Sequence, residues 1–133
     1  MPTAVSPDGK VVWVTARESN HLLAFSASRL RTDPRHAQLA SVRVGTAPVR
    51  LALLRDGARI VIADSNRFAT PGQAAALTVI DTRAALAHKS AVTGAIPAGT
   101  FPRELSVDAS HKRLLVTNFG SDQLEVVDTS HLP

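Results

Sequence analysis

The sequence predicts an all-β protein in which a unit of four antiparallel strands is repeated about three times. Three observations support this prediction: a sequence block recurs three times, Asp-Gly pairs separate short apolar runs, and one run in each copy is apolar on both faces. Aromatic residues make up only 4% of the 133 residues, whereas hydrophobic residues make up 44%. Val, Leu, Ile and Ala must therefore supply most of the core, which suits packed sheets.

The repeat becomes visible when segments beginning at Val5, Leu53 and Val107 are aligned, at separations of 48 (5 to 53) and 54 (53 to 107) residues. A second block follows in each copy, at 22–26, 77–82 and 124–129. Twelve residues separate the two blocks in the middle copy, and five separate them in the others. The middle copy therefore carries an inserted loop, at 65–76. A third block, Gly-Thr-x-Pro, links successive copies at 45–48 and 99–102.

Each copy is expected to hold four short strands. The first strand covers 49–54 and 103–108, with a stub at 3–6 in the first copy. The second strand covers 10–16, 58–64 and 112–118, and the third covers 21–27, 76–82 and 123–129. The fourth strand covers 39–44 and 92–97. The third copy therefore ends after its third strand.

Turn residues support these hairpins. Asp-Gly at 8–9 and 56–57 favours a tight reversal between the first two strands. In the third copy Ser110-His111 stands at that place, and a His at positive φ is strained, so we expect a longer or different turn there. Asp81 and Asp128 end the third strand, where a carboxylate can accept hydrogen bonds from the following backbone.

The second strand of each copy decides the architecture. Residues 11–14, 60–63 and 114–116 are apolar without alternation, so this strand must be covered on both faces. Radial stacking of the blades of a β-propeller provides such cover. We therefore expect one partial β-propeller domain over 1–133, with blades at about 1–46, 47–100 and 101–133. A two-sheet sandwich is the alternative, but it would not explain the repeat.

The third copy resembles the YVTN family of β-propeller repeats. Leu115-Val116-Thr117-Asn118 is followed by Gly120-Ser121 and by Val126-Val127-Asp128-Thr129, which is similar to the family's YVTN-x-G-S and V-I-D-T segments, with Leu115 in place of Tyr. The resemblance implies a ring of about seven blades, of which this chain would be a C-terminal portion, and a periplasmic or secreted parent protein. Alternatively, a short natural chain builds the ring by self-assembly. In both cases we expect missing blades or self-association to cover two open apolar faces.

Composition excludes several classes of site. The chain has no Cys, so disulfides, thiolate metal sites and Cys nucleophiles are excluded. The formal net charge is +4, but no run of five like charges occurs, and we expect no nucleic-acid partner. No segment approaches 18 apolar residues, so no membrane span is expected. The sequence lacks a His pair at metal-binding spacing, a Gly-x-Ser-x-Gly elbow and a Gly-rich phosphate loop, and it predicts no catalytic residue, metal or cofactor.

Candidate ligand contacts follow from the expected geometry. The connections into the first strand, 46–50 and 100–104, should line the mouth of the central channel. There Arg50, Arg103 and Glu104 could meet a bound anion or peptide, although such charges are often only solvated. The inserted loop adds Arg67 and Phe68, because loops longer than the repeat often carry binding specificity. A tolerated insertion is the structural alternative.

These observations predict a non-enzymatic β-propeller scaffold that binds a protein or a small ligand. The alternative, implied by resemblance, is part of a seven-bladed lactonase-type hydrolase whose active site lies mostly in other blades. A third possibility is a propeller attached to haem d1 or quinoprotein redox chemistry. No Cys-x-x-Cys-His motif for haem attachment occurs in the chain.

Overall fold

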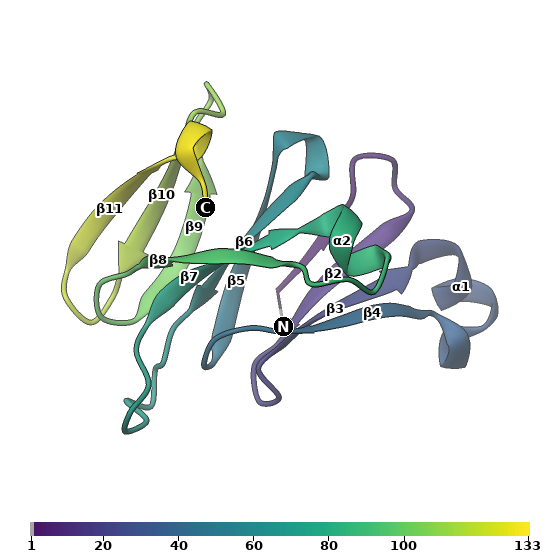
Figure 1. Ribbon diagram of the computed structural model, residues 1–133, viewed down its shortest axis with the longest axis horizontal. Coiled ribbons are helices and arrows are strands. Elements are labelled where there is room, and N and C mark those ends of the chain that lie inside the picture. The colour runs from purple at the N-terminus through teal and green to yellow at the C-terminus, as the bar shows by residue number, and fades with distance from the viewer. Residues whose placement is uncertain (1) are drawn as a thin grey trace.

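The computed structural model describes residues 2–133 as three antiparallel sheets that stand side by side (Figure 1). The first sheet contains β1 (Thr3–Val5), β2 (Val11–Ala16), β3 (His21–Ser26) and β4 (Gln38–Arg43). The second contains β5 (Pro48–Leu54), β6 (Arg59–Asp64), β7 (Ala76–Asp81) and β8 (Val92–Pro97). The third contains β9 (Pro102–Val107), β10 (Arg113–Asn118) and β11 (Gln123–Asp128). Every strand begins and ends within two residues of its expected position.

Small residues opposite Trp13 shape the inner face of the first sheet. Trp13 on β2 pairs with Ala4 on β1 and with Ala24 on β3, and Ala24 in turn pairs with Ala40 on β4. The alanines leave room for the indole, which is 2% exposed. This face packs against Ile60 and Ile62 of β6 and closes the first core between sheets.

The second strand of the middle sheet is buried on both faces, as the sequence predicts. Residues 60–63 of β6 are all 0% exposed. Ile60 and Ile62 belong to the core shared with the first sheet, whereas Val61 and Ala63 belong to the core shared with the third sheet. Leu114 and Val116 of β10 close that second core. The middle sheet thus anchors both neighbours.

The first and third sheets each keep one outward face open. On β10 the burial alternates, with Leu114 and Val116 fully buried and Leu115 between them half-buried. Leu124 and Val126 on β11 are 63% and 56% exposed, and Val5 on β1 is 54% exposed. Within residues 2–133, the outward faces of β2 and β10 therefore lack the cover that β6 receives on both sides.

The expectation of a different turn in the third copy is wrong. His111 adopts φ 58°, close to the φ of 73° at Gly9 in the first copy. Both turns close with the same backbone hydrogen bonds, from Gly9 N to Ser6 O (2.8 Å) and from His111 N to Asp108 O (3.0 Å). The third copy therefore makes the same reversal without a glycine.

Side-chain hydrogen bonds explain how this turn tolerates histidine. In the third copy the Ser110 hydroxyl donates to Asp108 Oδ1 (2.9 Å), which also accepts from the backbone N–H of Arg113 (3.2 Å). The first copy contains the same pair with the residues exchanged, since Ser6 donates to Asp8 Oδ1 at 2.6 Å. These hydrogen bonds stabilise the turn conformation and can offset the roughly 1 kcal/mol that a left-handed non-glycine residue costs.

Two short helices, which the sequence analysis did not predict, follow third strands: α1 (Ala27–Thr32) and α2 (Thr82–Leu86). The Asp81 carboxylate accepts from Ala84 N (3.0 Å) at the start of α2, and the Asp128 carboxylate accepts from Ser130 N (2.9 Å) in the 3₁₀ turn Thr129–His131. The expected backbone hydrogen bonds of these two carboxylates are confirmed. Neither described helix has the length or apolar character needed to cross a membrane.

The Gly-Thr-x-Pro connections fix how successive sheets join. A Cβ on Gly45 would lie 2.6 Å from the carboxyl group of Asp64, and a Cβ on Gly99 would lie 2.8 Å from the amide group of Asn118. Asp64 and Asn118 end β6 and β10 and are 0% and 2% exposed. Glycine is therefore required at both connections, because each packs its backbone onto a buried polar side chain.

Asp64 is a carboxyl group held in a nearly dry environment. The hydroxyl of Thr78 on β7 donates to its Oδ2, whereas its Oδ1 has no hydrogen-bond partner among the described residues. Burial raises the pKa of Asp64 from 3.8 to about 7. The group is therefore partly protonated near neutral pH.

This raised pKa predicts that the folded state loses stability as pH rises. A carboxyl whose pKa is raised on folding stabilises the folded state fully below pH 4, and this contribution is lost as pH rises through 7. Between pH 5 and pH 8 we expect the free energy of unfolding to fall by roughly 2 kcal/mol because of Asp64. Asp64→Asn should remove this part of the fall, and Asn118 at the same repeat position indicates that an amide fits. Urea unfolding of both proteins at the two pH values measures the difference; equal falls would contradict the prediction.

Candidate functional site

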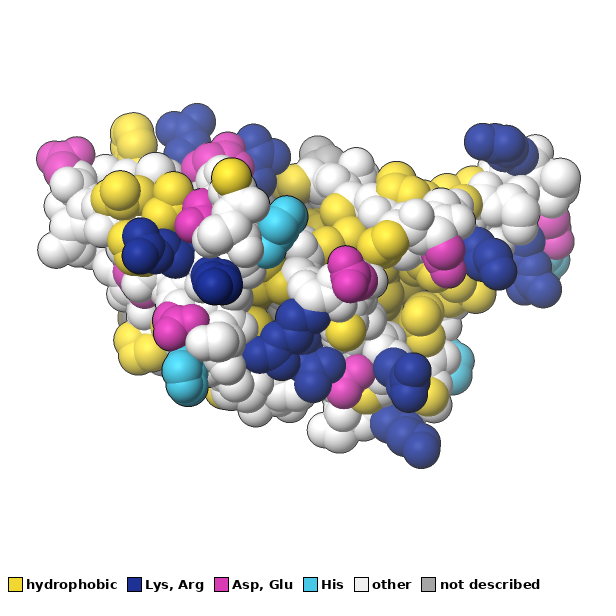
Figure 2. Space-filling view, turned by 90° about the horizontal axis from the view of Figure 1, so that it is seen from above, with side chains coloured by type: hydrophobic (Ala, Val, Ile, Leu, Met, Phe, Trp, Pro, Cys, Tyr) yellow, Lys and Arg dark blue, Asp and Glu magenta, His cyan; other side chains and the backbone are white. Residues whose placement is uncertain are grey.

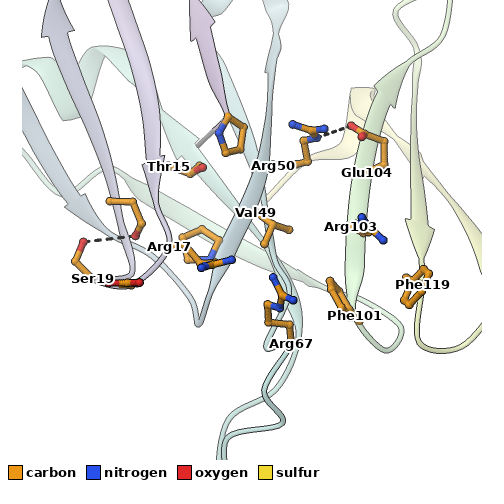
Figure 3. A pocket seen from close by; sticks show the side chains of 14 residues that line it. Thr15, Arg17, Ser19, Val49, Arg50, Arg67, Phe101, Arg103, Glu104 and Phe119 are labelled. Carbon is orange, nitrogen blue, oxygen red and sulfur yellow. Dashed lines mark hydrogen bonds and ion pairs between the residues drawn. The ribbon is translucent and has the colours of Figure 1, made fainter.

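A cavity of about 780 Å³ lies at the end of the sheets where first strands begin and second strands end. All three sheets and the loop after β6 contribute to it (Figure 3). The opposite end of the molecule, formed by the turns between first and second strands, is seen in Figure 2. There Lys and Arg are spread along the surface among apolar and acidic side chains. The cavity lies at the other end of the molecule, which Figure 2 does not show.

Four arginines and two glutamates line the cavity. Arg17 lies in the turn after β2, Arg50 on β5, Arg67 in the inserted loop and Arg103 on β9. Glu18 and Glu104 are the carboxylates of the lining. The structure thus brings together four of the five residues singled out from the sequence, namely Arg50, Arg67, Arg103 and Glu104. Phe68, the fifth, is not in the lining but lies beside Arg67.

Arg50 and Glu104 form an ion pair between the neighbouring strands β5 and β9. Arg50 Nε lies 2.8 Å from Glu104 Oε1, and the side chains are 44% and 50% exposed. Both residues follow the proline of a Gly-Thr-x-Pro connection, which places them at the cavity end of the first strand. Such an exposed pair adds little stability, but it offsets one of the four positive charges.

The guanidinium groups of Arg67 and Arg103 stack on aromatic rings and form no ion pair with described residues. Arg67 Cζ lies 5.1 Å from the ring centroid of Phe68 and 5.7 Å from that of Phe101, and Arg103 Cζ lies 5.2 Å from that of Phe119. Ring stacking holds a guanidinium in place while its N–H edges remain available as donors.

Arg17 is the cavity arginine that the sequence analysis missed. It is exposed, and no ion pair joins it to a residue within 2–133. A signal was present, because the turn between second and third strands must lie at the end of the sheet where the first strand begins. The turn of one blade therefore adjoins the connection into the next blade, which the antiparallel strand order predicts.

Phe101 and Phe119 form an aromatic pair that the sequence analysis also missed. Their ring centroids are 5.6 Å apart at an interplanar angle of 66°, an edge-to-face arrangement. Phe101 adopts φ 54°, a left-handed conformation that costs a bulky residue about 1–2 kcal/mol. The bond from Phe119 N to Phe101 O (2.8 Å) holds it there. Ala47 adopts φ 55° at the same place in the previous Gly-Thr-x-Pro segment.

A buried hydroxyl adds a polar point to the lining. Thr15 on β2 is 0% exposed, and its Oγ1 has no hydrogen-bond partner among the described residues.

None of the five histidines lines the cavity, and residues 2–133 contain no group of three or more His, Asp or Glu side chains placed to hold a metal ion. The arrangement provides hydrogen-bond donors and positive charge.

Comparison with known proteins gives a likeness in structure only. No protein-family model matches the sequence, and no curated protein matches it. A proposed 6-phosphogluconolactonase from Bacteroides uniformis is similar with a TM-score of 0.70 and 18% identity, over 95% of this chain and 35% of that one. The periplasmic gluconolactonase PpgL of Pseudomonas aeruginosa has a TM-score of 0.69 and 21% identity, over 95% and 34%. The hydrazine synthase of Kuenenia stuttgartiensis has a TM-score of 0.67 and 19% identity, over 96% and 37%.

The three sheets are β-propeller blades, which confirms the predicted fold class. The likeness covers nearly all of this chain, whereas the chain spans only about a third of the length of the structures it matches. At these identities the likeness carries the fold and no activity. The chain therefore has the fold of about three blades, with an arginine-lined cavity where the blades meet.

Proposed function

We propose that this chain is a YVTN-type β-propeller segment that binds a small anionic ligand without converting it. The observation that carries the proposal is the placement of Arg17, Arg67 and Arg103 around one cavity, each from a different blade and none in an ion pair with a described residue. Positive charges that face one cavity raise the local concentration of anions. A carboxylate or phosphate is the group that their donors fit.

The geometry of the cavity suits a small molecule. Its volume of about 780 Å³ lies in the range of small-ligand sites. Arg67 and Arg103 are held by ring stacking, so less side-chain freedom is lost on binding than for free arginines. The likeness to a periplasmic gluconolactonase supports an extracytoplasmic site of action as part of this proposal.

Charge substitutions in the cavity test this proposal. With phosphate or gluconate as probe, we expect Arg103→Ala and Arg67→Ala to weaken binding roughly five- to twentyfold, because each removes a charge-assisted donor. Arg50→Ala should also weaken binding, since it leaves Glu104 without its partner. Glu104→Gln should strengthen binding, because it removes a carboxylate and frees Arg50. Isothermal titration calorimetry at low and high salt measures these changes.

The matched control is Arg31→Ala, on α1 and outside the cavity lining. It changes the net charge equally, so it separates a local contact from the general positive field. Equal weakening by Arg31→Ala and Arg103→Ala would reject the cavity as the binding site. Unchanged affinity in both Arg50→Ala and Arg103→Ala would do the same.

Hydrolysis of a sugar lactone is the second candidate function, favoured by the likeness to gluconolactonase structures. In that case the cavity would form one part of a site completed by other blades, with Glu18 or Glu104 as its carboxylate. We expect the full chain to bind anions without accelerating gluconolactone hydrolysis. Hydrolysis above the spontaneous rate that disappears in Glu104→Ala would instead favour the hydrolase.

We also propose that the open faces of the first and third blades are covered by further blades or by a second copy of the chain. Leu124 and Val126 are more than half exposed on one face, and Val5 is more than half exposed on the first blade. The chain should therefore self-associate at micromolar concentration, and Val126→Lys should reduce the association. Sedimentation velocity measures both, and a monodisperse monomer would contradict this proposal.

A further inference from the structure

We propose that the ligand carries an aromatic ring next to its anionic group, so that the site recognises an aryl carboxylate or an aryl phosphate. This inference rests on the proposed anion-binding function and names the class of ligand. The structural basis is an alternating surface of rings and guanidinium groups, made by Phe68, Arg67, Phe101, Phe119 and Arg103. We call it the aromatic–arginine surface.

Aromatic residues are concentrated at this surface far beyond their share of the chain. The chain has four Phe, one Trp and no Tyr, and three of the four Phe lie here. The Trp is buried in the core between the first two blades. Phe68 belongs to the second blade, and Phe101 and Phe119 approach it from the third. Packing needs do not explain this gathering, because the two cores between blades contain none of the three.

These rings are left partly uncovered. Phe68 is 70% exposed and Phe119 is 61% exposed, so most of their apolar surface faces solvent. Phe101 is held in a left-handed conformation that a glycine would adopt without strain. Exposed aromatic surface of this kind is typical of a recognition site.

Stacked arginines favour an aromatic ring over a saturated one. Each guanidinium is a flat cation that attracts the face of an aromatic ring. The exposed Phe rings can pack against a ligand ring in an edge-to-face or offset-stacked arrangement. The N–H edges of Arg67 and Arg103 meanwhile remain donors for a carboxylate or phosphate. A ring and an anionic group on one molecule would therefore be bound side by side, whereas a sugar acid would leave the rings without a partner.

The test compares ligands that differ only in the ring. The full chain is titrated with benzoate and cyclohexanecarboxylate, and with phenyl phosphate and inorganic phosphate, by calorimetry or ligand-detected NMR. We expect each aromatic ligand to bind roughly three- to tenfold more tightly than its partner without an aromatic ring. Whichever of benzoate and phenyl phosphate binds more tightly identifies the anionic group that the site prefers, a carboxylate or a phosphate.

Two variants assign the preference to the aromatic–arginine surface. Phe119→Leu keeps an apolar side chain and should abolish the preference for benzoate, because benzoate affinity should fall more than cyclohexanecarboxylate affinity. Phe25→Leu, on β3 and outside the cavity, is its matched control. Phe101→Gly and Ala47→Gly both replace a left-handed residue by glycine at the same repeat position, but only Phe101→Gly should reduce the preference.

The outcomes separate the two proposals. If neither these four anions nor gluconate binds, the proposed function fails and this inference fails with it. If benzoate and cyclohexanecarboxylate bind equally, or if Phe119→Leu keeps the preference, anion binding stands and the aromatic ligand class is rejected. A preference lost equally in Phe25→Leu would also reject the surface defined here.

Discussion

Burial of one strand on both faces is the constraint on which this structure depends. β6 supplies residues to two cores at once, with Ile60 and Ile62 toward the first blade and Val61 and Ala63 toward the third. An antiparallel sheet that is apolar on both faces cannot be stable alone in water, so it recruits a sheet to each side. Repetition of the same strand in the neighbouring blades then continues the stack. The need for cover on both faces follows from the sequence of the strand itself.

The connections between blades couple this stack to the cavity. In each Gly-Thr-x-Pro segment the glycine lies against a buried Asp or Asn at the end of the next blade's second strand. The residue before proline takes a left-handed conformation, and the strand that follows begins at the cavity. In the second connection the left-handed residue is Phe101, whose ring meets Phe119. A segment needed for blade packing thus also positions an aromatic ring of the candidate site.

Much of the fold could be predicted because it depends on local patterns. Strand positions follow from apolar runs and turn residues, and the inserted loop follows from the repeat spacing. The turn at His111 could not be predicted from the preference of one residue, because Asp108 and Ser110 hold it through side-chain bonds. Arg50, Arg67, Arg103 and Glu104 could be placed near the channel from strand order. Arg17 could have been placed by the same strand order. Phe101 and Phe119 were missed because their pairing is a tertiary contact, which neither hydrophobic period nor turn chemistry encodes.

Comparison of equivalent positions in the three copies separates two kinds of position, those that keep the same chemical character and those that do not. Core positions keep their character, as in Val14, Ile62 and Val116, each an aliphatic residue at the same place on a second strand. Positions of the cavity lining do not. Arg17 and Phe119 are equivalent in the repeat to the buried Ser65, Phe101 is equivalent to the buried Ala47, Arg103 to Val49 and Glu104 to Arg50. Packing requires the same chemistry in every blade, so it explains the first set. It gives no reason for a charge, a hydroxyl and a ring to replace one another at the second set. The proposed binding of a single ligand across the blades would give one, because such a ligand presents a different part of its surface to each blade.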